Sequence, residues 1–321
     1  MIAIAVPRNY VDHFEPLAEL IRERGLECGI YGETDLHVLP DPEMIEILVP
    51  AAAPCGAKEM DLMPRLRAIV SPVIGFDWVD IDAATQRGII VANTEAQENR
   101  ESMAEATILL LLTLLYRLRD TEALLRDNLG PDTVERHLLK SRTIGIIGFG
   151  GIAQEVLERL APWGCEFLIT CRSEPAPIPK ASFVPLDQLL EQSDAILVLT
   201  REDEQTRRMI GAEQFAKVRP GTLLVNTARG GILDEEALIE ALRSGRIGAA
   251  ALDVFDKEPL DTKSPLRELP NVILTPHCIG HTHESRATGP RVAAENVLQI
   301  VEGKIPDSCK NSEALARNPP S

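Results

Sequence analysis

The sequence predicts an α/β protein with two domains, each built on a parallel β-sheet. Short apolar segments alternate along the chain with longer segments whose apolar residues recur at helical spacing, which is typical of parallel strands joined by helices. The chain has 321 residues, more than one hydrophobic core usually supports. One strand–helix–strand unit also carries a glycine-rich turn that the N-terminal units lack, which indicates two domains with different tasks.

The N-terminal domain is expected to contain five strands. The first strand opens the chain, and it lacks the charged region and cleavage site of a signal peptide. Two helical segments, His13–Arg24 and Asp82–Arg87, lie between strands. The expected strands are Ile2–Val6, Glu27–Tyr31, Ile45–Val49, Leu66–Val70 and Ile89–Asn93.

The segment Arg142–Arg172 is the most informative part of the sequence. It consists of a strand, a glycine turn, a helix and a second strand, at Thr143–Ile147, 148–153, Gln154–Trp163 and Phe167–Thr170. Gly148 allows a sharp turn, Gly150 lets backbone N–H groups approach a pyrophosphate, and the small Ala153 keeps helix and strand in contact. The segment therefore predicts a Rossmann-like dinucleotide-binding unit.

The same alternation continues to residue 301. Further strands are expected at Ala195–Leu199, Thr222–Asn226, Gly248–Val254 and Val272–Thr275, and helices at Ser102–Leu118, Pro185–Gln192, Gly211–Val218, 234–244 and Ser285–Val301. The dinucleotide-binding domain is expected to span residues 99–283, and residues 1–98 and 284–321 to form a flavodoxin-like, substrate-binding domain, with a cofactor cleft between the two. Residues 119–141 are expected to be a polar connection, and residues 311–321 a mobile tail.

Composition excludes several classes of partner. The 33 basic and 49 acidic residues give a formal charge of −16, so neither nucleic acid nor an anionic membrane is an expected partner. The six cysteines are scattered without paired spacing, which favours a reducing cytoplasm over a disulfide framework or a zinc cluster. The most apolar run, Ile108–Tyr116, is far shorter than a membrane span and is expected to be a buried helix.

Three segments that follow strands of the second domain, or lie beside one, contain residues suited to catalysis. Arg229 lies in a glycine-flanked loop, where it either holds a carboxylate bidentately or caps a helix as a surface residue. His277 follows another strand, and beside a carboxylate such as Glu258 it suits proton exchange with a hydroxyl near neutral pH. Alone, His277 would more often be a satisfied structural histidine, and Glu258 a solvated acid. A metal site at His277, His281 and His283 lacks further ligands nearby, so no metal is expected.

Together these segments resemble the D-isomer-specific 2-hydroxyacid dehydrogenase family over nearly the whole chain, and within it the glyoxylate/hydroxypyruvate reductases. Besides the glycine turn, the matching segments are Val73–Asp77, Ser102–Glu105, Asn226–Gly230, Leu252–Phe255 and Thr275–His277. The resemblance implies an enzyme that moves a hydride between a nicotinamide cofactor and C2 of a small 2-oxo or 2-hydroxy acid. In that enzyme His277 would exchange the proton, Glu258 would orient and charge the imidazole, and Arg229 would bind the carboxylate and polarise the carbonyl.

The resemblance also implies the binding residues and a homodimer. Backbone N–H groups of Ile74 and Gly75 would bind the substrate carboxylate, together with Arg229 and His277. The implied cofactor contacts are Gly148, Gly150, Gly151, Ile152, Cys171, Arg172, Ser173, Thr200, Thr227, Ala228, Asp253 and Gly280. The segment Ile108–Tyr116 would lie either in the dimer contact or within its own domain.

The sequence departs from the family where an acidic residue usually holds the adenosine ribose. Cys171 stands at that position, followed by Arg172 and Ser173. Without the acid a 2′-phosphate is not repelled, and an arginine with a hydroxyl can bind it, so NADP(H) is favoured and NAD(H) is the alternative. Glu174 competes with this interpretation, because it reaches the ribose if the loop bends.

Two other functions remain open. One is a corepressor-like binding protein of the same fold that senses the dinucleotide, although such a sensor does not need Arg229, Glu258 and His277. The other is a dehydrogenase acting on formate or phosphite, which needs other residues in the substrate loop. Val73 and Ala106 replace the family's usual glycine and histidine, which leaves the exact substrate open but not the type of reaction.

Overall fold

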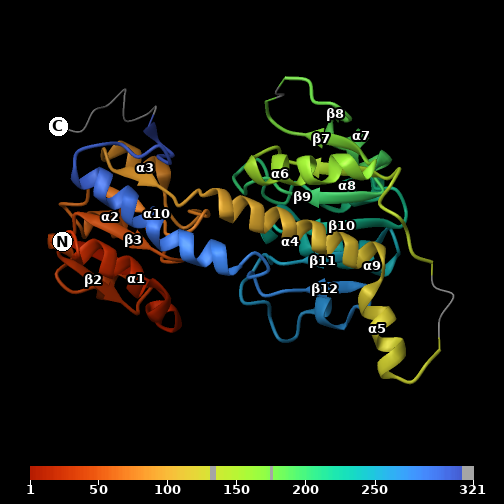
Figure 1. Cartoon of the computed structure of the whole chain (residues 1–321), viewed down its shortest axis with the longest axis horizontal. Helices are drawn as coiled ribbons and strands as arrows, with labels where there is room; N and C mark the ends of the chain where they lie inside the picture. Colours follow the sequence, from red (N-terminus) through yellow and green to blue (C-terminus); the bar gives the residue numbers. More distant parts are fainter. Residues whose placement is uncertain (131–134, 174–175, 313–321) are drawn as a thin grey trace. The chain divides into compact units, whose positions relative to one another are not determined.

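A computed structural model describes residues 1–130, 135–173 and 176–312 of the chain. These residues form two compact units (Figure 1). Unit 1 comprises Met1–Asn99 and Thr282–Ser321, and unit 2 comprises Arg100–His281. The chain therefore passes between units close to the expected boundaries, which lie after residues 98 and 283.

Unit 1 is built on a five-stranded parallel sheet with the order β2-β1-β3-β4-β5. Its strands are β1 (Ile2–Ala5), β2 (Cys28–Tyr31), β3 (Ile47–Pro50), β4 (Ala68–Val70) and β5 (Ile90–Ala92). Its helices are α1 (Val11–Arg22), α2 (Ala57–Asp61), α3 (Ile81–Gln86) and α10 (His283–Val301), with short 3-10 turns at Arg8–Tyr10, Leu36–Val38 and Pro42–Met44. Side chains of β1 alternate between two cores: Ile2 and Ile4 pack with α1 and α10, whereas Ala3 and Ala5 pack with α2 and α3. Helices thus cover both faces of the sheet (Figure 1).

The prediction of a mobile tail from Asn311 onward is wrong at its first residue. Asn311 is buried, and its amide donates hydrogen bonds to Thr85 Oγ1 and the Ile89 carbonyl, at 3.0 and 2.9 Å, while its oxygen accepts one from the N–H of Val91. The backbone N–H of Lys310 also donates to Val91, over 2.7 Å. The C-terminal segment therefore covers the exposed edge of β5, which would otherwise present unpaired backbone groups. The rest of the expected tail, residues 313–321, lies outside the described part of the chain.

Unit 2 is built on a seven-stranded parallel sheet with the order β12-β11-β10-β9-β6-β7-β8. Its strands are β6 (Thr143–Ile147), β7 (Glu166–Thr170), β8 (Ala181–Phe183), β9 (Ala195–Val198), β10 (Thr222–Asn226), β11 (Ile247–Leu252) and β12 (Val272–Leu274). Helices α4 (Gln97–Leu115) and α6 (Gly151–Leu160) contribute to one core, and α7 (Leu186–Gln192), α8 (Ala212–Lys217) and α9 (Glu235–Arg243) to the other. Short 3-10 turns lie at Ala161–Trp163, Gly230–Ile232 and Pro265–Glu268. Strand order reverses direction between β6 and β9, and ligands bind at this kind of switch point in open α/β sheets.

Two predictions for the first part of unit 2 need correction. The expected polar connection contains a helix, α5 (Leu118–Arg126), which ion pairs Arg117–Asp120 and Glu122–Arg126 support along its surface. The run Ile108–Tyr116 is only partly buried, because α4 buries Leu110, Leu111 and Leu114 but leaves Leu109 54% exposed. Within the described residues, no helix is long and apolar enough to cross a membrane.

Candidate active site

The glycine turn has the geometry of an anion cradle. Gly148 has a φ of +97°, and a Cβ there would lie 2.6 Å from the backbone of Thr200, so this position requires glycine. Gly150 precedes the first turn of α6, and a Cβ there would meet no atom within 4 Å. The space beside Gly150 is therefore open, and the first N–H groups of the helix favour negative charge, as the binding of a pyrophosphate requires.

His277 and Glu258 are in direct contact at the end of the sheet where strands β11 and β12 finish. Nδ1 of His277 lies 2.7 Å from Oε2 of Glu258, and Oε1 of Glu258 accepts a hydrogen bond from the N–H of Phe255 over 3.1 Å. Desolvation alone would raise the pKa of Glu258, but the hydrogen bond and charge of His277, together with the Phe255 N–H and the charge of Arg229, lower it overall. The carboxylate of Glu258 therefore fixes one edge of the His277 imidazole, and the charge of Arg229 is close enough to act on that carboxylate.

Asp253 holds the loop that carries His277. This buried aspartate accepts hydrogen bonds through Oδ1 from the hydroxyl of Thr275 (2.6 Å) and from the N–H groups of Cys278 (3.1 Å) and Ile279 (3.3 Å). The N–H of His277 donates to the carbonyls of Asp253 and Thr275. His277 adopts a φ of +51°, a left-handed conformation that is uncommon for residues other than glycine. The loop thus imposes a strained backbone that aims the imidazole at Glu258.

The turn that carries Arg229 is shaped by Asn226 and Gly230. The fully buried Asn226 accepts a hydrogen bond from the N–H of Ala228 (3.1 Å) and donates one to the Arg229 carbonyl (2.9 Å). A Cβ on Gly230 would overlap the backbone of Phe255, so the Arg229 turn packs directly against the loop that ends at Glu258. The structure therefore brings all three predicted catalytic residues together within unit 2.

Helix α4 supports these loops through residues whose role the sequence did not reveal. The Ser102 hydroxyl donates to the carbonyl of Gly280, three residues beyond His277. The hydroxyl of Thr107 is hydrogen-bonded, at 2.8 Å, to the hydroxyl of Thr227, which lies two residues before Arg229. Both α4 residues are buried. The local sequence signal that could have indicated this role is the pair of small polar residues itself, five positions apart on one predicted helix.

The loop after β7, where the sequence predicts the contact with the adenosine ribose, carries an ion pair. Arg172 Nη2 contacts both carboxylate oxygens of Asp203, and Cys171 Sγ donates to the Ser173 carbonyl at 3.3 Å. Asp203 was not among the predicted site residues. Glu174, which competes with Arg172 in the sequence-based interpretation, lies outside the described residues.

The predicted substrate loop, in unit 1, is tied to its own sheet. Asn93 donates to the carbonyl of Ile74 over 2.7 Å, and Ser71 donates to the carbonyl of Gly75 over 2.5 Å. Both anchoring residues are buried at the ends of strands β5 and β4. These bonds fix the direction of two consecutive peptide carbonyls in the loop.

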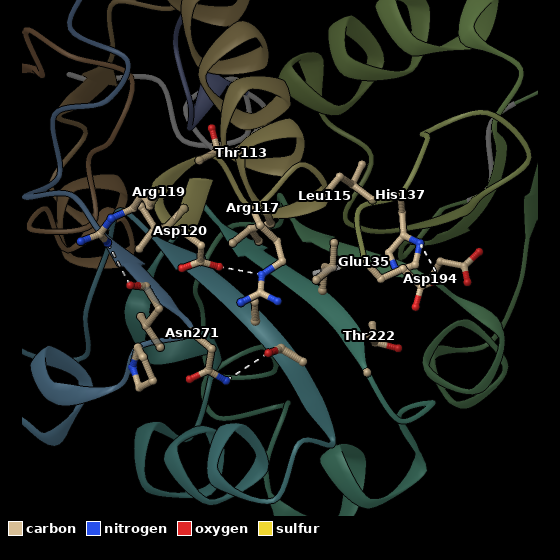
Figure 2. Close-up of a pocket in the computed structure, with 18 of the residues that line it drawn as sticks. Thr113, Leu115, Arg117, Arg119, Asp120, Glu135, His137, Asp194, Thr222 and Asn271 are labelled. Atoms are coloured by element: carbon tan, nitrogen blue, oxygen red, sulfur yellow. Dashed lines mark hydrogen bonds and ion pairs between the residues drawn. The ribbon is translucent and has the colours of Figure 1, made fainter. Parts of the chain in front are cut away.

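A cavity of about 560 Å³ lies elsewhere in unit 2, at the amino ends of strands β10, β11 and β12 (Figure 2). Three arginines on its wall are ion-paired: Arg117 with Asp120 at 2.6 Å, and Arg142 and Arg219 with Asp194 at 3.4 and 2.9 Å. The predicted catalytic residues follow the carboxyl ends of the strands instead. This cavity is therefore separate from the candidate active site. In the described part of the chain, no three His, Cys, Asp or Glu side chains are placed to hold a metal ion.

The fold and the site define a two-domain α/β dehydrogenase with a Rossmann-type NAD-binding unit. Residues 108–278 match the model of the NAD binding domain of D-isomer specific 2-hydroxyacid dehydrogenases. The chain belongs to this family, and it is an oxidoreductase of the class that transfers a hydride between NAD(P) and a 2-oxo or 2-hydroxy acid.

Individual relatives agree with this assignment. The chain is 35% identical over 272 residues to the glyoxylate reductase of Thermofilum pendens, covering 82% of this chain and 80% of the relative. It is 33% identical to the glyoxylate/hydroxypyruvate reductase B of Yersinia enterocolitica, covering 89% and 90%. The crystal structure of D-lactate dehydrogenase from Aquifex aeolicus, complexed with NAD and lactic acid, superposes with a TM-score of 0.83 at 27% identity over 94% of this chain and 95% of that one. These matches give no support to the corepressor alternative.

Proposed function

We propose that this enzyme reduces a small 2-oxo acid of the glyoxylate or hydroxypyruvate type to its 2-hydroxy acid, with Arg229, Glu258 and His277 as the catalytic set. The observation that supports this most strongly is the contact between His277 and Glu258 beside the Arg229 turn. Because Nδ1 of His277 faces Glu258, the other ring nitrogen, Nε2, is the atom that exchanges a proton with the substrate oxygen. Arg229 binds the carboxylate and polarises the carbonyl.

The relatives support the choice of substrate. Those with the names glyoxylate reductase and glyoxylate/hydroxypyruvate reductase B are 33–35% identical to this chain over most of its length. Backbone N–H groups of Ile74 and Gly75 are proposed to contribute to carboxylate binding. The carbonyls in the same two peptide groups are those of Val73 and Ile74. They accept hydrogen bonds from Ser71 (3.1 Å) and Asn93 (2.7 Å), which fixes the direction of both N–H groups.

The cofactor is proposed to be NADP(H) in preference to NAD(H). The nicotinamide supplies or accepts the hydride when bound. The pyrophosphate would be held by the turn before α6, with Gly148 and Gly150, and by the first two residues of the helix, Gly151 and Ile152. Arg172 and Ser173, after β7, would bind a 2′-phosphate. The remaining predicted contacts belong to loops after the strands: Cys171, Thr200, Thr227, Ala228, Asp253 and Gly280.

A panel of glyoxylate, hydroxypyruvate and pyruvate with NADPH and NADH tests this function. Wild-type enzyme is expected to oxidise the reduced cofactor with at least one of these acids. Arg229→Ala is expected to lower kcat/KM by about 10²–10³-fold, because a charge-assisted bidentate contact in the transition state is lost. Arg243→Ala, which removes an exposed arginine paired with Glu240 on α9, is the matched control and should retain activity. Turnover by Arg229→Ala at the wild-type rate would remove that residue from the catalytic set.

A homodimer is also proposed, formed through the segment that spans the end of α4 and α5. Of the thirteen large hydrophobic residues that are exposed in the described part of the chain, six lie from the second half of α4 to the residues that follow α5: Leu109, Tyr116, Leu118, Leu125, Leu129 and Leu138. Residues of the same segment line the cavity in Figure 2. Exposed apolar side chains concentrated in one segment of a charged protein are typical of a subunit contact. The six unbridged cysteines support a reducing cytoplasm as its location.

A further inference from the structure

The ion pair between Arg172 and Asp203 lies at the adenosine end of the proposed cofactor site. Arg172 follows β7 and Asp203 lies in the loop after β9. These strands flank β6 on opposite sides, and Thr170 and Val198 are both in register with Ile147, the last residue before the glycine turn. The two loops therefore leave the sheet on either side of the turn that would hold the pyrophosphate.

The guanidinium of Arg172, which would bind the 2′-phosphate of NADP(H), is already paired with the carboxylate of Asp203. Arg172 Nη2 lies 2.6 and 2.5 Å from the two oxygens of Asp203. Arg201 Nε lies 3.3 Å from the same carboxylate. The hydrogen bond from Arg172 is the main reason that the pKa of Asp203 is lowered to about 2, so the carboxylate is charged at all physiological pH values.

The Asp203 carboxylate does not depend on Arg172 for its position. Its Oδ1 accepts hydrogen bonds from the N–H groups of Gln205 (3.0 Å) and Thr206 (3.2 Å) in its own loop. The Thr206 hydroxyl in turn accepts from the N–H of Asp203 over 2.8 Å. This local turn fixes the anion even when the arginine moves away.

A fixed carboxylate treats the two dinucleotides differently. A 2′-phosphate carries up to two negative charges near neutral pH, and it must take Arg172 from Asp203 while remaining near that carboxylate. The 2′-hydroxyl of NAD(H) carries no charge. It therefore does not compete with Asp203 for Arg172, and the Asp203 carboxylate does not repel it.

We propose that Asp203 modulates the cofactor preference of this enzyme. Its carboxylate is an internal anion that binds Arg172 and competes with the 2′-phosphate of NADP(H) for it, and it leaves the binding of NAD(H) unaffected. The carboxylate tempers a preference for NADP(H) that Arg172 and Ser173 would otherwise make stronger. This inference rests on the proposed cofactor site and is independent of which 2-oxo acid is reduced.

Binding measurements on the full chain test the proposal without turnover. Affinities of NADPH, NADH, 2′-AMP and 5′-AMP are compared between wild type and Asp203→Asn, which keeps an acceptor oxygen for its loop but carries no charge. NADPH and 2′-AMP are expected to bind about tenfold more tightly to the variant, and NADH and 5′-AMP to change by less than about twofold. Arg172→Ala is expected to weaken NADPH binding in either background.

The matched control is Asp187→Asn. It also removes one negative charge from an exposed ion pair in unit 2, with Lys217 at 2.9 Å, and should leave all four affinities unchanged. Unchanged or weaker NADPH binding by Asp203→Asn would overturn the proposal, and so would an equal gain in Asp187→Asn. If wild type binds neither dinucleotide, the cofactor site fails and the inference fails with it. If wild type binds both dinucleotides but turns over no 2-oxo acid, only the proposed substrate class is refuted. The ratio of NADPH affinities between Asp203→Asn and wild type then still decides the role of Asp203.

Discussion

At the scale of single residues, the Glu258 carboxylate is the group whose titration matters most. Its pKa lies below its ordinary value of 4.5 in the folded protein. A carboxylate with a lowered folded-state pKa contributes stability above its unfolded pKa, and loses that contribution as pH falls through the folded value. Glu258 is therefore charged near neutral pH, where it accepts the hydrogen bond from His277.

Glu258→Gln is expected to lower kcat/KM by about 10–100-fold near neutral pH, because the imidazolium loses its charged partner. Its effect on stability should depend on pH. The difference in unfolding midpoint between wild type and variant should be largest near about pH 7 and shrink toward about pH 3, as the wild-type carboxylate is protonated. Thermal unfolding across this range measures it. A constant difference would show that the Glu258 carboxylate gains nothing from folding.

Asp253 gives a second test at this scale. Asp253→Ala leaves one hydroxyl and two backbone N–H groups without their acceptor, and is expected to lower the free energy of unfolding by roughly 2–4 kcal/mol. Asp253→Asn retains an acceptor oxygen and should lose much less. Chemical denaturation compares the two variants. Equal losses in both would mean that the charge, and not the acceptor geometry, holds the loop.

The candidate catalytic residues could be predicted from the sequence, but the residues that hold their loops in place could not. Arg229 and His277 stand out because each follows a strand in a recognisable motif. The roles of Asn226 and Asp253 depend on hydrogen bonds to neighbouring loops, and the left-handed backbone of His277 depends on those bonds too. Local sequence carries no signal for contacts of this kind.

At the scale of secondary-structure elements, the start of helix α6 offers a matched pair of glycines. Gly150 and Gly211 both precede a helix with extended backbone, at φ of −87° and −109°. A Cβ at either position meets no atom closer than ordinary contact distance. Only Gly150 belongs to the proposed pyrophosphate cradle.

Gly150→Ala is expected to weaken dinucleotide binding by about tenfold or more while the unfolding midpoint stays near wild type, because the methyl group enters space that the pyrophosphate needs. Gly211→Ala should change neither quantity. Calorimetric titration with NADPH and NADH, alongside thermal unfolding, checks both variants. Unaltered cofactor affinity in Gly150→Ala would place the dinucleotide elsewhere.

Elements that contain an apolar run or a strong period were predictable, and elements without such a pattern were not. The βαβ unit and the strands around it appear where the apolar segments predict them, and so do the three-residue strands β4, β5 and β12. Neither β8 (Ala181–Phe183) nor α2 (Ala57–Asp61) contains an apolar run, and their place in the fold comes from tertiary packing. Helix α5 was missed because five of its nine residues are polar or charged, a composition that also suits a surface loop.

At the scale of the whole molecule, the exposed leucines near α5 predict a dimer. Leu125 is 80% exposed, and replacing it by glutamate should place a charge in the subunit contact. Leu125→Glu is therefore expected to shift the protein toward monomer in sedimentation or light-scattering measurements. Val38→Glu alters a residue in unit 1 that is 58% exposed, and should leave the assembly intact. A monomeric wild type would remove this proposal.

The two-domain organisation was predictable because the glycine-turn unit is bracketed by strands on both sides. The covering of the β5 edge by Asn311 was not, since it joins residues that are 220 or more positions apart in the chain. Long-range pairing of this kind leaves no trace in local composition.

Transfer of deuterium is the most direct test of the central claim, that a hydride passes to C2 of a 2-oxo acid while His277 supplies the proton. Hydroxypyruvate is reduced with a cofactor deuterated at both positions of nicotinamide C4, and the product is analysed by mass spectrometry. Wild type is expected to place one deuterium on C2, and His277→Gln to lose about a thousandfold in rate with cofactor affinity unchanged. Product without deuterium, or wild-type turnover by His277→Gln, would contradict the account.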